Sequence, residues 1–296
     1  DVAPRRFLKV LDPEQASFGD DSSGRLELAE KLTDPGNPLT ARVFVNRIWG
    51  LLMGGHLVET PSDFGLQGSP PSHPELLDWL AHEFVANGWS TKRLVRMIVG
   101  SQVDQQRSTQ RQMAEAIDPQ NRLYWRANRK HLSIEQIRDG MLAVSGQLDR
   151  TPGGKAGRLW GDDYSKRRTV YGYINRFNLD PTLRAFDFPT PMRTQPARGE
   201  TIVAPQALFT MNSPFVIDQA KAIVASDAFQ ALATNEQRIN HLFTTIVQRR
   251  PANPEVARVG KYLEQQAKFA GAPRAGSPWP LLAQALLMSN EFQYID

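Results

Sequence analysis

The 296-residue chain contains no cysteine. This absence excludes disulfide bonds, thiol catalysis, thiolate metal sites and covalent haem attachment through a C-x-x-C-H motif. It does not indicate a compartment, because a chain of this length can build a core that needs no disulfides. Any chemistry must therefore come from side chains other than thiols.

The sequence also lacks a long apolar run. No stretch approaches the roughly 18 apolar residues of a membrane-spanning helix, so we expect no membrane span. The first residues, 1–6, are not followed by the apolar stretch of a secretory signal. They also lack an initiator methionine. We therefore expect the chain to be a fragment of a longer protein, with any targeting signal upstream.

Neither sign of charge is in large excess. The chain has 35 Lys and Arg residues against 31 Asp and Glu residues, a formal net charge of +4. Its basic clusters, at 126–131, 166–168 and 249–250, are short and far apart in the sequence, whereas nucleic-acid-binding proteins usually gather positive charge on one face. We therefore interpret the clusters as solvated surface. Nucleic-acid binding is kept as the second alternative function, and it requires that the clusters converge.

Several motifs that identify enzymes are missing too. The sequence contains no G-x-S-x-G elbow, no P-loop and no G-x-G-x-x-G fingerprint. A hydrolase elbow, a nucleotide site and a Rossmann fold therefore lack support. We expect no cofactor in this chain, and whether it is an enzyme stays open at this point.

Helix signals, in contrast, occur along most of the chain. Apolar residues at helical spacing predict one helix over 25–32 and another over 40–53, with Thr40 as the N-cap of the second. A capping box, in which Ser or Thr is followed three residues later by Glu or Gln, predicts helix starts at Ser72, Ser133 and Thr234. Further helices are predicted at 91–98, 206–211 and 214–226, and from Asn253 and Ser277 onward.

The stretch 151–213 differs from the rest. Its β-branched and aromatic run 169–174 is the best strand candidate, and the prolines that follow fill a segment too long for an ordinary connection. We predict a mainly α, multi-helix globular domain with a proline-rich irregular central segment and at most a small β element. We expect one compact domain over 1–296, with an N-terminal helical subregion 24–150, an irregular subregion 151–213 that holds a short strand, and a C-terminal helical subregion 214–296.

One candidate binding site is a row of side chains along the predicted helix 40–53. Arg42, Asn46, Trp49 and Met53 follow one another at steps of four, three and four, so they share a helix face. Arginine can bind a carboxylate with two hydrogen bonds, and tryptophan can stack on a sugar. The alternative, which we favour, is a second packing face in which Arg42 and Asn46 hydrogen-bond to the proline-rich loops, because buried polar groups usually serve the structure.

A second candidate is the glycine-rich loop that precedes the helix start at Ser72. Asp63, Gln67 and His73 lie in this loop, close to a helix N-terminus that attracts anions such as phosphate or sulfate. Ordinary capping of the helix explains the same residues, and we favour that alternative.

A metal site can be imagined nearby. Glu75, Asp78 and His82 are roughly stacked on one helix face, and His73 could join them as a mixed oxygen and nitrogen site. No recognised ligand spacing is present, however. We predict no metal site and interpret these residues as a solvated face.

A third group of polar residues lies in and after the proline-rich segment. Asp187 and Glu200 could form the two-carboxylate pair of glycoside hydrolysis, so a carbohydrate-active enzyme is the first alternative function. Asp187 could equally pair with Arg193 or cap a turn. Arg198 belongs to the same polar group, and Gln206 and Asn212 complete the candidate binding residues.

Several strings of residues resemble a known family. They are N-P-L-T-A-R-V and N-R-I-W in 37–49, T-P-S-D-F-G in 60–65, G-S-P-P-S-H-P-E-L-L-D-W-L in 68–80, F-D-F-P in 186–189, Q-A-L in 206–208, N-S-P-F-V in 212–216 and S-N-E-F in 289–292. With these strings in this order, the chain resembles the planctomycete surface and cytochrome-associated domain known as domain of unknown function 1553.

The resemblance implies a context. Relatives are typically the C-terminal part of large bacterial proteins, often with a cytochrome-c-like domain upstream. This implies an extracytoplasmic location, in the periplasm or at the cell surface, a haem in an upstream domain, and a role with polysaccharide. It carries over no catalytic residue. We therefore expect an accessory or ligand-binding module that binds a glycan or a neighbouring redox domain of the same polypeptide.

Overall fold

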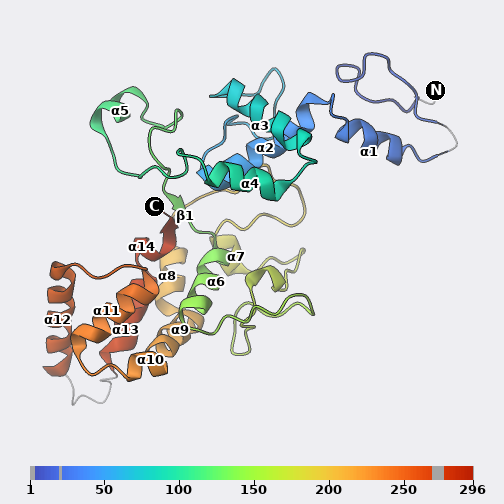
Figure 1. Cartoon of the computed structure of the whole chain (residues 1–296). Coiled ribbons are helices and arrows are strands. Elements are labelled where there is room, and N and C mark those ends of the chain that lie inside the picture. The colour runs from blue at the N-terminus through green and yellow to red at the C-terminus, as the bar shows by residue number, and fades with distance from the viewer. Residues whose placement is uncertain (1–3, 20–21, 269–276, 296) are drawn as a thin grey trace. The chain divides into compact units, whose positions relative to one another are not determined.

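The computed structural model describes residues 4–19, 22–268 and 277–295 (Figure 1). Over these residues the chain forms fourteen α-helices, and the one sheet found there has two short strands. This confirms the prediction of a mainly α fold with at most a small β element. Within the same ranges, no helix combines the length and the apolar character that crossing a bilayer requires.

The chain divides into two compact units, residues 1–129 and residues 130–295. Each unit has its own hydrophobic core. The boundary falls inside the predicted subregion 24–150, so the helix predicted to start at Ser133 belongs to the second unit. That the two units form one compact domain stays a prediction.

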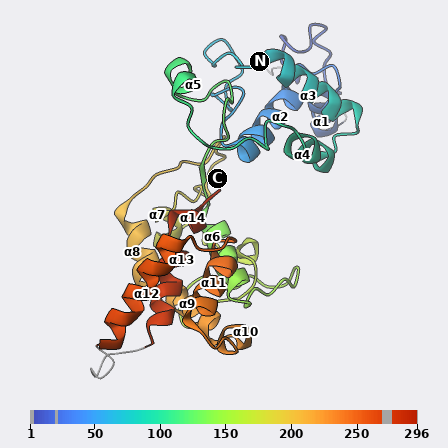
Figure 2. The ribbon, with the colours of Figure 1, turned by 60° about the vertical axis from the view of Figure 1, so that its left-hand side comes forward.

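The described residues of the first unit form five helices. They are α1 (Arg25–Thr33), α2 (Pro38–Met53), α3 (Pro74–Ala86), α4 (Thr91–Val99) and α5 (Gln112–Ile117). α2, α3 and α4 pack on one another and enclose the core, as both ribbon views show (Figures 1 and 2). Helices α1 and α5 bury none of their own residues.

Two of the predicted helix starts in this unit are wrong. α2 begins two residues before Thr40, because Asn37 caps it by accepting a hydrogen bond from the Leu39 backbone and Pro38 fits the first turn. The residue before α3 is His73, without a side-chain cap, and Ser72 instead donates its backbone N–H to the Leu57 carbonyl. The backbone N–H of Ser72 is therefore already bonded within the loop and does not take part in a capping box.

The second unit holds the remaining elements. They are β1 (Lys130–His131), α6 (Ile134–Val144), α7 (Pro181–Ala185), α8 (Ala204–Asn212), α9 (Pro214–Ala225), α10 (Asp227–Gln230), α11 (Asn235–Ile246), α12 (Asn253–Lys268), α13 (Pro278–Leu287), α14 (Asn290–Gln293) and β2 (Tyr294–Ile295). β1 pairs with β2 in antiparallel register. α9 packs along α13, and α6 and α8 also contact α9.

The capping boxes of this unit are confirmed. Ser133 and Gln136 cap α6 reciprocally, and Thr234 and Gln237 do the same for α11. The strand predicted over 169–174 is wrong, because residues 169–171 form a single 3-10 turn. The Asp139 carboxylate accepts hydrogen bonds from both the N–H and the hydroxyl of Thr169, and this holds the segment in a turn rather than in a ladder.

Candidate functional site

The polar row on α2 connects that helix to its neighbouring loops. Asn46 is fully buried, and its side chain both accepts from the Val58 N–H at 2.8 Å and donates to the Val58 carbonyl at 3.0 Å. Trp49 is buried as well, and its indole N–H donates to the Tyr124 hydroxyl at 2.8 Å. Arg42 pairs with Asp78 of α3 at 2.7 Å. Asn46 thus binds a loop, as in the alternative favoured from the sequence, whereas Arg42 pairs with a helix residue instead of a loop. The Trp49 ring is buried and offers no open face for a sugar.

The loop before α3 is held by its own backbone and hydroxyl groups. Asp63 accepts a hydrogen bond from the Gly65 N–H at 2.8 Å, and its carbonyl accepts one from the Thr60 hydroxyl at 2.7 Å. His73 pairs through Nδ1 with the Ser72 hydroxyl at 3.0 Å. The Gln67 side chain is exposed. Across the described residues, no three His, Asp or Glu side chains gather in a way that could hold a metal ion.

Two of the predicted residues of this region, Asp187 and Gln206, contact Thr201 at the base of a loop. Asp187 has a positive φ of 55°, which Asp tolerates better than most residues, and its carboxylate accepts from the N–H and the hydroxyl of Thr201 at 2.7 and 2.8 Å. Gln206 is buried and donates to the carbonyls of Ala185 and Thr201 at 3.0 and 2.9 Å. Asp187 and Gln206 thus both hold Thr201 and close the loop 188–200.

A further arginine of the same polar group in the sequence completes this closure. Arg198 donates to both carboxylate oxygens of Glu135 on α6, at 3.0 and 2.9 Å, and to the Phe186 carbonyl at 2.9 Å. Arg193 and Glu200 are exposed on the loop itself. The structure therefore brings Asp187 together with Thr201, rather than with a second carboxylate.

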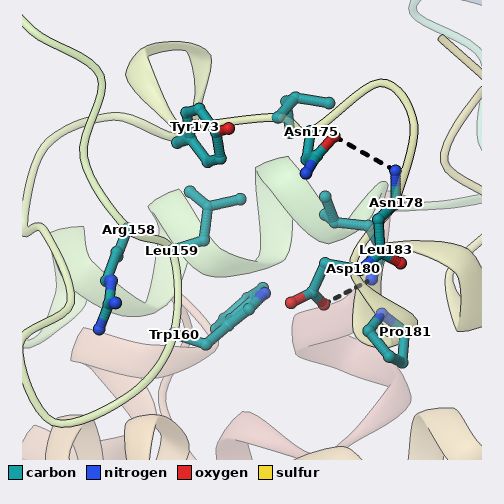
Figure 3. A pocket seen from close by; sticks show the side chains of 10 residues that line it. Arg158, Leu159, Trp160, Tyr173, Asn175, Asn178, Asp180, Pro181 and Leu183 are labelled. Atoms are coloured by element: carbon teal, nitrogen blue, oxygen red, sulfur yellow. Dashed lines mark hydrogen bonds between the residues drawn. The ribbon is translucent and has the colours of Figure 1, made fainter.

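A cavity of about 310 Å³ lies elsewhere in the second unit (Figure 3). Its lining residues come from three stretches of the chain: residues 158–160, residues 173–175 with 178, and residues 180, 181 and 183. Trp160 and Tyr173 are its aromatic residues, and Figure 3 shows the Trp160 indole below Leu159 and Tyr173 above it. Tyr173 is 62% exposed, so its ring is available to a ligand.

Four polar side chains of three types surround these two rings. Asn175 accepts hydrogen bonds from the N–H groups of residues 177 and 178 through its carbonyl oxygen, which leaves its amide NH2 for other partners. Asn178 is exposed beside it. One oxygen of Asp180 accepts from the first N–H groups of α7. Arg158, which pairs with Asp163 at 3.2 Å, completes the lining. The cavity therefore offers amide, carboxylate and guanidinium groups around an aromatic pair.

A buried arginine holds the wall that carries Trp160. Arg138 of α6 is 1% exposed, and its guanidinium donates to the carbonyls of Leu159, Ser165 and Arg167 and to the Thr169 hydroxyl. Burial lowers the pKa of Arg138, and the neighbouring Asp139 carboxylate partly offsets that effect. One buried side chain thus fixes several backbone groups of the segment 159–169.

The orientation of Trp160 follows from the rings around it. The Arg138 guanidinium lies 5.7 Å from the centre of the indole, and Phe209 and Phe215 contact it edge-on at centroid distances of 5.0 and 5.4 Å. Its Nε1 is buried without a hydrogen-bond partner among the described residues. The indole is therefore positioned by packing and by the cation beneath it, not by a hydrogen bond.

Sequence reasoning missed the residues of this cavity. Tyr173 fell in the run interpreted as a strand, and Trp160 and Asp180 lie in a stretch interpreted only as irregular. The available signal was the alternation of aromatic residues with Asn and Asp between 160 and 180. Of the predicted site residues, Asn212 lines a second cavity that also contains Trp160.

Comparison with known proteins gives a family but no activity. A family model described as PSD1, protein of unknown function (DUF1553), matches residues 24–263. The chain therefore belongs to this family, as its strings of residues indicate. No curated protein and no solved structure matches it.

Proposed function

We propose that this member of the DUF1553 family is a binding module that holds a saccharide in the cavity beside Trp160 and Tyr173. The observation that carries the proposal is the combination of two aromatic rings with Asn, Asp and Arg side chains around one hollow. Sugars present C–H faces that pack on aromatic rings and hydroxyl groups that both donate and accept. The lining of this cavity matches both features.

The size of the cavity suits a short stretch of glycan. Ligand pockets span roughly 300 to 1,000 Å³, and at about 310 Å³ this one lies at the lower end. Among the described residues, Asp180 is the only carboxylate that lines it, whereas glycoside hydrolysis uses two carboxylates about 5–10 Å apart. The lining therefore supports binding rather than hydrolysis.

The wider role belongs to the same proposal. The family resemblance supports a module at the C-terminus of a larger extracytoplasmic protein, where it would bring polysaccharide close to upstream domains, including a haem domain. Its partners would then be a glycan on one side and its own polypeptide on the other. The lining of the cavity supports the glycan as ligand, and the family resemblance supports the extracytoplasmic location.

A glycan array followed by calorimetry tests the proposal. We expect Tyr173→Ala to weaken binding of the array hits by about tenfold, since loss of an aromatic contact costs roughly 1–1.5 kcal/mol. Asn178→Ala should weaken it as well. Phe177→Ala is the matched control, because Phe177 lies on the same loop, is 85% exposed and does not line the cavity. Absence of any hit, or equal affinity of the Tyr173 and Phe177 variants, refutes the proposal.

A further inference from the structure

A second cavity lies directly beside the first. Trp160 and Pro181 line both, and the second cavity measures about 540 Å³. The two hollows therefore share Trp160 and Pro181 as part of their walls, and Figure 3 shows these residues at the lower rim of the first cavity.

The second cavity differs from the first in chemistry. Phe186, Phe209 and Phe215 line it together with Leu208, and its described lining residues include no charged side chain. Phe209 lies edge-on to both Phe186 and Trp160, with centroids 5.5 and 5.0 Å apart. These rings form a fixed apolar wall, while Leu208 is 55% exposed at its border.

We propose that the ligand of this module is amphipathic: a saccharide that carries an apolar group, such as an alkyl or aryl aglycone or an acyl chain. The saccharide occupies the first cavity, and the apolar group passes Trp160 and Pro181 into the second. This inference rests on the proposed saccharide binding and adds the class of its ligand.

The contrast between the two linings is what selects such a ligand. The first cavity carries hydrogen-bonding and charged groups that an apolar molecule would leave unpaired, and an unpaired buried polar group is costly. The second carries apolar surface whose removal from water favours binding in proportion to its area. A molecule with a polar and an apolar part satisfies both, and the shared position of Trp160 places the junction between the two parts.

Matched pairs of glycosides test the inference. The probes are methyl and hexyl β-D-glucopyranoside, methyl and hexyl β-D-galactopyranoside, and the corresponding pair of N-acetyl-β-D-glucosaminides, together with the same pair for any other sugar that the array identifies. For the sugar that binds, we expect the hexyl glycoside to bind at least tenfold more tightly than the methyl glycoside, because burial of methylene groups is favourable.

Two variants of α8 locate the effect. Leu208→Gln should abolish the advantage of the hexyl glycoside and leave the affinity for the methyl glycoside unchanged. Met211→Gln is the matched control, because Met211 is on the same helix, is 52% exposed and does not line the cavity. Circular dichroism would show that both variants fold.

The outcomes separate this inference from the proposed function. If methyl glycosides bind but the hexyl group brings no gain, the amphipathic ligand is refuted and saccharide binding stands. A gain that Leu208→Gln leaves intact also refutes the inference. If only hexyl compounds bind, whatever the sugar, and Tyr173→Ala has no effect, saccharide binding falls and the inference falls with it.

Discussion

Replacement of Arg138 by methionine is the sharpest test of how the cavity wall is held. Methionine keeps most of the volume and the apolar stem but removes the guanidinium. That group donates to the Leu159 and Arg167 carbonyls at 3.2 and 3.0 Å, to the Thr169 hydroxyl at 3.2 Å and to the Ser165 carbonyl. In the variant, three backbone carbonyls lose their donor.

The size of the effect follows from the burial of these carbonyls. The bond to Leu159 is buried, whereas those to Ser165 and Arg167 are part-buried, so water can reach their oxygens. An unsatisfied buried group costs about 1–3 kcal/mol, and the two wetter carbonyls cost less. The variant no longer buries a charge, which offsets part of the loss. We expect the free energy of unfolding to fall by about 2–3 kcal/mol.

Urea denaturation followed by fluorescence measures this change, and hydrogen exchange shows where it arises. The Gly157 and Ser165 amides, which donate to the Tyr171 and Arg158 carbonyls, should lose protection in the Arg138→Met protein. Arg150→Met is the control, since residue 150 is exposed and such changes usually stay within about 0.5 kcal/mol.

A loss below about 1 kcal/mol with unchanged exchange at residues 157–169 would show that packing of Trp160, not the Arg138 network, holds this wall. The position of Trp160 beside the proposed ligand would then be set by its contacts with Phe209 and Phe215.

Three further predictions concern other parts of the chain. Burial, and then the positive charge of Arg47, lower the pKa of His56. Because the pKa in the folded state lies below the unfolded value near 6.5, the contribution of His56 to stability should be complete above that pH and decrease as the pH drops toward the folded pKa. His56→Gln should flatten this pH dependence of the free energy of unfolding, measured by denaturation at several pH values. Asn46→Ala should cost about 2–3 kcal/mol in urea denaturation, since both Val58 backbone groups lose their buried partner; a cost under about 1 kcal/mol would contradict this. Asp187→Ala should speed proteolytic cleavage within 188–200, because Thr201 loses both bonds that help close the loop; equal cleavage rates would contradict that role.

The helical part of the fold could be predicted because its signals are local. The boxes at Ser133 and Thr234 need only residues within one turn, and both are formed. The sequence at Ser72 has the same pattern, but the backbone N–H of Ser72 donates instead to the carbonyl of Leu57, fifteen residues earlier. The run 169–174 failed for the same reason, since Asp139, thirty residues earlier, determines the conformation of Thr169. Pattern reasoning fails where a distant residue competes for the same groups.

The candidate site could not be predicted for a related physical reason. Reasoning from motifs selected polar side chains in unusual settings, and the structure shows that Asn46, Asp187 and Gln206 satisfy the backbone of long irregular loops. A helical protein with such loops needs buried side chains of this kind, because loop N–H and C=O groups have no ladder to join. Residues that can bind a ligand must instead keep groups unpaired and accessible. Tyr173 and Asn178 do so on an exposed loop whose local sequence looks ordinary, and only their position around the hollow beside Trp160 distinguishes them.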